Sequence, residues 1–299
     1  MDLFRYRGPI VTLLSLFATV LALMVAAPAS AEDAAFIIVN PAGRGNQSQA
    51  EGFLADFAQA LAASWPKDAG PCPAWKGHYH VHQADALASI RGAEPVFGLL
   101  SPGFHLFARG ELDARARLLP TLADGGDTTR VVAVTLSGSA AETSLRAGRA
   151  TGLRFGGQVV GEAHYTRRLV LSALEGADTA VLEPQARTLR AIRALKKKAL
   201  DAVLMTAADW SRLEASGMSA GLAVAFEVGG LAGGPVVVFG EPDARAEAAL
   251  RALAAFPETA AGRAVLETMG LAGFAEVAAS DYDALAARYQ DQGAAPETP

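Results

Sequence analysis

The segment LAVAFEVGGLAGGPVVVFG, residues 222–240, joins two apolar β-type runs through a glycine-rich middle. Its two ends, 222–228 and 235–240, have the composition of buried strands, and GGLAGG between them predicts a loop. A second long run of this kind, RVVAVTL at 130–136, also lies beside glycine and serine residues. We interpret these runs as segments that cross between two lobes of one chain.

Outside these runs the chain alternates between predicted strands and predicted helices, which is typical of an α/β fold with largely parallel sheets. The predicted strands cover residues 34–40, 78–82, 95–100, 157–161, 178–183 and 201–205, and the predicted helices cover 47–63, 83–91, 163–174, 185–198, 206–216 and most of 241–290. We expect lobe 1 to comprise residues 32–132 and 236–299, lobe 2 to comprise residues 137–226, and a cleft to separate them.

The composition of the chain limits which partners and which stabilising interactions the protein can have. The 299 residues carry a net charge of −5 and one cysteine, Cys72. An acidic balance argues against nucleic acid as the main partner. A single cysteine cannot form an internal disulfide, so the stability of the fold must come from its core.

The N-terminus has the composition of an export signal. Arg5 and Arg7 precede an almost wholly apolar run at residues 10–27, and a small-x-small signal follows at residues 29–31. This order predicts a signal peptide over residues 1–31, cleaved after Ala31, and a periplasmic protein. An uncleaved membrane anchor is the alternative, because the apolar run is close to the length of a membrane span.

Four stretches together resemble one known family. They are PVFGLLSPGFHLF (95–107), RALKKKALDAVLMTAADWSRL (193–213), VAFEVGGLAGGPVVVFG (224–240) and ETMGLAGFAEVAASDYDALAARY (267–289). Over essentially the whole mature chain they look like the periplasmic solute-binding proteins of phosphate, phosphite and phosphonate ABC transporters. The resemblance implies a two-lobed periplasmic-binding-protein type II fold and a membrane permease as partner. We expect a monomer that has no cofactor and is not an enzyme.

The second lobe departs from the family pattern at GEAHYTRR (161–168). Typical members present a Ser/Thr-rich stretch to the phosphonate at a helix start, whereas this chain has Glu162 there, followed by Tyr165 and Thr166. A carboxylate at a helix start competes with a bound anion for the same N–H groups. We therefore expect a small organic ligand, phosphonate-like or partly apolar, rather than a bare oxyanion.

Candidate ligand-binding residues follow the predicted strands, because ligands of open α/β sheets bind beyond the carboxyl ends of the strands. For residues 40–46 the alternative is a flexible turn without a ligand contact. For residues 101–105 the alternative is a plain helix start. The candidates are Asn40, Arg44, Ser101, Phe104, His105, Glu162, Tyr165, Thr166 and Met205, with Leu231 closing the cleft from the crossing segment.

Three histidines lie close together in GHYHVHQ (77–83). On a strand, His78, His80 and His82 would share one face, where two of them could reach a zinc ion. No other ligand cluster lies near them in the sequence, so we interpret the stretch as an edge strand with solvated histidines and expect no metal site. A metal-dependent protein using these histidines, and the ligand-binding component of a sensor system, are the alternative functions.

Neither a catalytic set nor a docking motif stands out. Ser137 and Ser139 lack the G-x-S-x-G elbow of a nucleophile, and no general base is marked beside them. The lysines at 196–198 are interpreted as a solvated helix end, with a contact to the transporter as the alternative.

Overall fold

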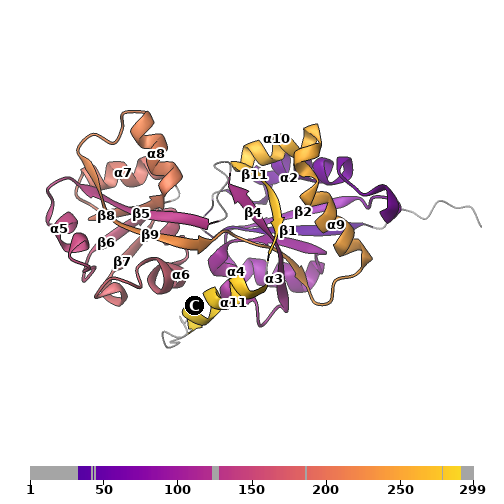
Figure 1. The fold of residues 1–299 in the computed structure, drawn as a ribbon, viewed down its shortest axis with the longest axis horizontal. Coiled ribbons are helices and arrows are strands. Elements are labelled where there is room, and N and C mark those ends of the chain that lie inside the picture. Colours follow the sequence, from indigo (N-terminus) through magenta and orange to yellow (C-terminus); the bar gives the residue numbers. More distant parts are fainter. Residues whose placement is uncertain are drawn as a thin grey trace, which may run out of the picture.

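Two β-sheets, each covered by helices, form two lobes joined by extended segments (Figure 1). The computed structural model describes residues 33–290, except residues 42, 44, 123–127, 186 and 278. The predicted signal peptide therefore lies outside the described residues. The predicted α/β class and the two-lobed arrangement are confirmed.

The sheet of the first lobe has the strand order β11-β4-β10-β3-β1-β2. The strands are β1 (Ala34–Val39), β2 (Trp75–His80), β3 (Phe97–Leu100), β4 (Ala114–Leu122), β10 (Val236–Phe239) and β11 (Leu271–Glu276). β1 pairs in parallel with β2 and β3, whereas β10 runs antiparallel to β3 and β4. β2 is at the sheet edge, as predicted, but it ends at His80, so His82 lies beyond the strand.

Helices cover both faces of this first sheet. They are α2 (Gln47–Ala63), α3 (Gln83–Ala93), α4 (Pro102–Ala108), α9 (Ala244–Ala254) and α10 (Ala260–Met269), with short 3-10 turns at Lys67–Ala69 and Phe256–Glu258. The face of the sheet that α2, α9 and α10 cover has a core rich in aromatic rings. Phe36 and Phe97 stack there, with their ring centroids 5.6 Å apart. The α3 and α4 side packs against Ile37, Val39 and Val237. Alternate residues of a strand thus supply two separate cores.

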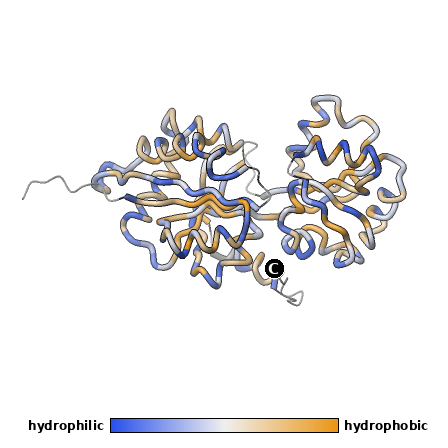
Figure 2. Tube along the Cα trace, turned by 180° about the vertical axis from the view of Figure 1, so that it is seen from behind, coloured by the Kyte–Doolittle hydropathy of each residue, from blue (hydrophilic) through white to orange (hydrophobic). Residues whose placement is uncertain are grey.

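The sheet of the second lobe has the order β7-β6-β8-β5-β9. Its strands are β5 (Thr128–Leu136), β6 (Arg154–Gly157), β7 (Val181–Pro184), β8 (Ala202–Thr206) and β9 (Leu222–Ala232). Its helices are α5 (Ala140–Arg146), α6 (Ala163–Tyr165), the π-helical turn η3 (Thr166–Val170), α7 (Thr188–Lys196) and α8 (Ala207–Ala215), with 3-10 turns at Val159–Gly161 and Ala177–Thr179. Figure 2 shows hydrophobic residues concentrated along the strands of both lobes.

The crossing between the lobes differs in detail from the prediction. β9 continues through residues 229–232, pairing with β5 as far as Ala232, so the predicted loop GGLAGG is wrong over its first four residues. Gly230 adopts a left-handed φ of 68°, and the register of β9 against β5 shifts nearby. Glycine permits this bulge, so the strand bends instead of ending. Residues 233–235 then lead into β10 of the first sheet. The exact lobe boundaries stay a prediction.

Two other predicted elements are wrong. GQVVG was expected as a strand, but β6 ends at Gly157, whose φ of 118° is unfavourable for other residues, and a 3-10 turn follows. The C-terminal region was expected to be almost all helical, but Gly270 ends α10 in the left-handed conformation. Residues 271–276 then pair with β4 as β11 before α11 (Ala279–Gln290) begins.

No helix among the described residues is long and apolar enough to cross a membrane. The apolar run at 10–27 lies outside them.

Candidate functional site

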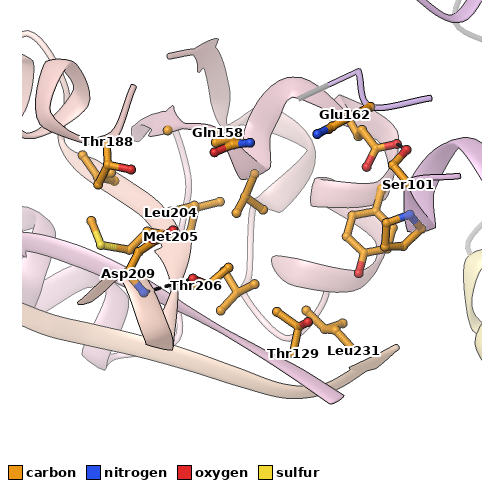
Figure 3. Close-up of a pocket in the computed structure, with 17 residues that line it drawn as sticks. Ser101, Thr129, Gln158, Glu162, Thr188, Leu204, Met205, Thr206, Asp209 and Leu231 are labelled. Atoms are coloured by element: carbon orange, nitrogen blue, oxygen red, sulfur yellow. Dashed lines mark hydrogen bonds between the residues drawn. The ribbon is translucent and has the colours of Figure 1, made fainter. Parts of the chain in front are cut away.

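A cavity of about 230 Å³ lies where the strand ends of the two lobes face each other (Figure 3). The first lobe contributes Asn40, after β1, and Ser101 and Pro102, after β3. The second lobe and its crossing strands contribute Thr129, Val131, Gly157, Gln158, Val159, Glu162, Tyr165, Thr188, Val203, Leu204, Met205, Thr206, Asp209 and Leu231.

Helix starts position several of these side chains. Ser101 is the N-cap of α4, and its hydroxyl accepts a hydrogen bond from the N–H of Phe104 at 3.4 Å. Thr206 is the N-cap of α8, and its hydroxyl accepts from the N–H of Asp209 at 3.1 Å. Capping residues have extended backbones and turn the chain from strand to helix. The polar groups of the cavity are thereby fixed at the junctions where strands end.

Glu162 of the second lobe is bound by the start of α4 in the first lobe. The Ser101 hydroxyl donates to Glu162 Oε1 at 2.6 Å, and the main-chain N–H groups of Gly103 and Phe104 also donate to this carboxyl group. The Glu162 residue is only 7% exposed. Burial raises the pKa of its carboxyl group, and the three hydrogen bonds oppose that rise. The carboxyl group is therefore fully engaged inside the protein.

Tyr165 forms a buried wall beside Glu162. It is 7% exposed and lines the cavity. Burial, followed by the nearby Glu162, raises the pKa of its hydroxyl group, so the phenol stays neutral across the physiological range. Its ring thus offers apolar area to a ligand without adding charge.

The rest of the cavity wall mixes apolar and hydroxyl groups (Figure 3). Met205 and Leu231 supply apolar surface, and Thr188, Thr206 and Gln158 supply neutral polar groups. Asp209 pairs with Arg212 at 2.8 Å. Among the described residues that line the cavity, the charged ones are the acids Glu162 and Asp209. None of these lining residues is a lysine, an arginine or a histidine.

The structure brings together five of the nine predicted ligand-binding residues: Asn40, Ser101, Glu162, Tyr165 and Met205 all line the cavity, as does Leu231. Arg44 lies outside the described residues.

The other three candidates point elsewhere. Phe104 is fully buried among the side chains between α3, α4 and the sheet. His105 packs edge-on against Tyr282 of α11, with ring centroids 5.0 Å apart. Thr166 is fully buried and donates its hydroxyl hydrogen to the carbonyl of Val159 at 2.9 Å. Each of these residues lies within one helical turn of a residue that lines the cavity, but its own side chain faces a core.

Several lining residues escaped the sequence analysis. Asp209 follows a predicted strand, so the strand-end rule applied to Met205 also pointed toward it. Thr188 begins a helix that was predicted three residues too early. Gln158 was assigned to a strand that ends before it, and Thr129 lies on a crossing strand whose pattern gives no sign of a ligand.

The histidine stretch shows no metal-binding arrangement. Among the residues that the structure describes, no group of three or more His, Cys, Asp or Glu side chains could hold a metal ion. His78 and His80 are half-buried rather than solvated, and burial lowers the pKa of both imidazoles. The interpretation of the strand's histidines as solvated was therefore wrong for these two residues.

Comparison with known proteins identifies the fold. No protein-family model and no curated protein matches the chain. The solved structure of XAC2383 from Xanthomonas citri bound to ATP has a TM-score of 0.68 at 10% identity, covering 87% of this chain and 98% of that one. PhnD1 from Prochlorococcus marinus in complex with methylphosphonate has a TM-score of 0.61 at 11% identity, covering 87% and 99%.

A binding protein component of an ABC phosphonate transporter from Pseudomonas aeruginosa has a TM-score of 0.58 at 14% identity, covering 82% of each chain. At these identities the likeness shows the fold. The predicted class, a two-lobed periplasmic-binding-protein type II fold, is confirmed.

Proposed function

We propose that this protein is the solute-binding component of an ABC transporter, with its ligand held in the cavity between the lobes. The observation that carries the proposal is the composition of the cavity wall, which takes residues from the strand ends of both lobes. A ligand there touches both lobes at once and can favour their closure. One structurally similar protein is described as a binding protein component of an ABC phosphonate transporter, which supports a transport role, and another was solved in complex with methylphosphonate.

The ligand class follows from the lining. Ligand pockets usually measure roughly 300–1,000 Å³, so a cavity of about 230 Å³ suits a small molecule. Tyr165, Met205 and Leu231 favour an apolar part, and the threonines and Gln158 favour a neutral polar part. Two carboxyl groups oppose an anion. The proposed ligand is a small, partly apolar organic molecule that is neutral or cationic.

The proposal extends to the setting of the protein. The leader at residues 1–31 directs the chain to the periplasm and is cleaved after Ala31. The mature protein acts there as a monomer, by binding and delivering its ligand to a membrane permease rather than by catalysis.

Native mass spectrometry of the purified mature protein, followed by a thermal-shift panel, tests this function. We expect a co-purifying small organic molecule, or a panel member of that class that raises Tm, whereas phosphate and methylphosphonate leave Tm unchanged. Gln158→Ala should weaken the shift, because Gln158 lines the cavity. Gln185→Ala is the matched control outside the cavity. Tight methylphosphonate binding unaffected by Gln158→Ala would overturn the assigned ligand class and site.

A further inference from the structure

The two lobes are joined through a buried carboxyl group that belongs to the chain itself. Glu162, at the start of α6, accepts hydrogen bonds from Ser101, Gly103 and Phe104, all at the start of α4. The first N–H groups of a helix have no partner within the helix. Glu162 supplies that partner from the other lobe, and with 7% exposure it does so away from water.

The close fit at this contact limits which residue position 103 can hold. A Cβ atom at Gly103 would lie 2.7 Å from Glu162 Oε1 and 2.8 Å from Tyr165 Cβ. Glycine is thus needed for α4 to approach the second lobe so closely. The contact is a fitted interface and not a chance approach of two flexible side chains.

Helix α11 makes a second connection between the lobes. Near its start, Asp283 pairs with Arg109 at the end of α4 at 2.8 Å, and the Tyr282 hydroxyl donates to the carbonyl of Gly233 in the crossing segment. At its other end, the carbonyl of Tyr289 accepts from Arg168 Nη1 of the second lobe at 2.5 Å. Figure 1 shows α11 beside α4, with its C-terminal end directed toward the second lobe.

The apolar side chains follow the same path. Leu106 of α4, Leu285 and Tyr289 of α11, and Tyr165 and Leu169 of the second lobe belong to one continuous buried cluster. Separating the lobes at this side would expose that apolar surface to water, which opposes the separation. Polar and apolar contacts therefore act together at one edge of the cavity.

We propose that Glu162 and helix α11 form an internal lock that holds the two lobes together before a ligand binds. The carboxyl group of Glu162 already occupies the N–H groups of Gly103 and Phe104 at the start of α4. This inference rests on the proposed solute-binding function for its meaning, but the lock itself concerns only the chain's own contacts. Ligand entry then requires a minor open state, which lowers the apparent affinity.

Small-angle X-ray scattering of the full mature protein in buffer tests the lock. Wild-type scattering should fit the arrangement of the two lobes in Figure 1. Glu162→Ala should increase the radius of gyration and broaden the distance distribution. Glu162→Gln, which keeps one carbonyl acceptor, should have a smaller effect. Ser139→Ala is the matched control, because Ser139 caps α5 wholly within the second lobe.

Hydrogen exchange supplies a second measurement on the same variants. In Glu162→Ala the amides at 103–104 and those of α11 should exchange about tenfold faster or more, because the amides lose their buried acceptor and α11 loses the contact between the lobes that supports it. Faster exchange at 103–104 alone, with unchanged scattering, would mean local fraying and would refute the lock.

Wild-type scattering that fits separated lobes would also refute the lock. Circular dichroism confirms that each variant is folded. None of these measurements needs a ligand, so the lock can fail while solute binding stands, and the thermal-shift panel can fail while the lock stands.

Discussion

Gly103 and Glu162, from different lobes, lie so close together that a methyl group at Gly103 would be 2.7 Å from the carboxyl oxygen Oε1. Fifty-nine positions separate the two residues in the sequence, and each follows a different strand. Their contact therefore depends on the lobes meeting in one arrangement. A side chain at position 103 would have to move Glu162, Tyr165 or α4.

Gly103→Ala should consequently destabilise the protein. Added atoms in a tightly packed region typically reduce the free energy of unfolding by about 1–3 kcal/mol. Chemical denaturation monitored by circular dichroism measures the change. Gly110→Ala is the matched control, since a Cβ atom there meets nothing within 4 Å. Equal stabilities of the two variants would contradict the close interlobe contact.

Tyr165→Ala should weaken ligand binding by more than about 1 kcal/mol, because it removes a buried aromatic wall of the cavity. Isothermal titration calorimetry with the solute identified by the thermal-shift panel measures the loss. Phe107→Ala is the control, since Phe107 lies on the neighbouring α4, is 51% exposed and does not line the cavity. Unchanged affinity in Tyr165→Ala would place the ligand elsewhere.

The sequence predicted the parts of this site that depend on local pattern. Apolar runs marked most strands, and the rule that ligands lie beyond strand ends selected Asn40, Ser101 and Met205. It could not orient side chains after the turn, because one position along a helix rotates a side chain by about 100°. Phe104 and His105 therefore face cores, although Ser101 beside them lines the cavity.

Contacts between segments far apart in the sequence were harder to predict. The charge of Glu162 suggested competition with an anion, but nothing in the local pattern indicated that Ser101 would bind it. Likewise, GQVVG has strand composition, yet a Cβ atom at Gly157 would lie 2.2 Å from the Leu204 carbonyl oxygen. The approach of a neighbouring strand, which local composition does not encode, accompanies the turn at this point.

Replacing His78, His80 and His82 together with glutamine should leave solute binding intact, because none of the three lines the cavity. Elemental analysis of protein purified without a histidine tag should find no stoichiometric zinc in either form, in keeping with the absence of a metal-binding group among the described residues. One zinc per wild-type chain, lost in the triple variant, would establish the metal-binding alternative.

His105 should make the stability of the protein depend on pH. The residue is 1% exposed, and burial, followed by the charge of Arg109, lowers the pKa of its imidazole from 6.5 to about 4. The folded protein therefore binds a proton less readily than the unfolded chain. The contribution of His105 is fully present above pH 6.5 and is lost as the pH falls toward 4, by roughly 3 kcal/mol in the free energy of unfolding.

His105→Phe should remove this part of the pH dependence, because phenylalanine keeps a ring against Tyr282 but cannot be protonated. Urea denaturation of both proteins at intervals between pH 7 and pH 4 measures the difference in slope. His82→Gln is the control, since the His82 side chain is exposed. Parallel curves for wild type and His105→Phe would show that the imidazole is not held neutral by burial against α11.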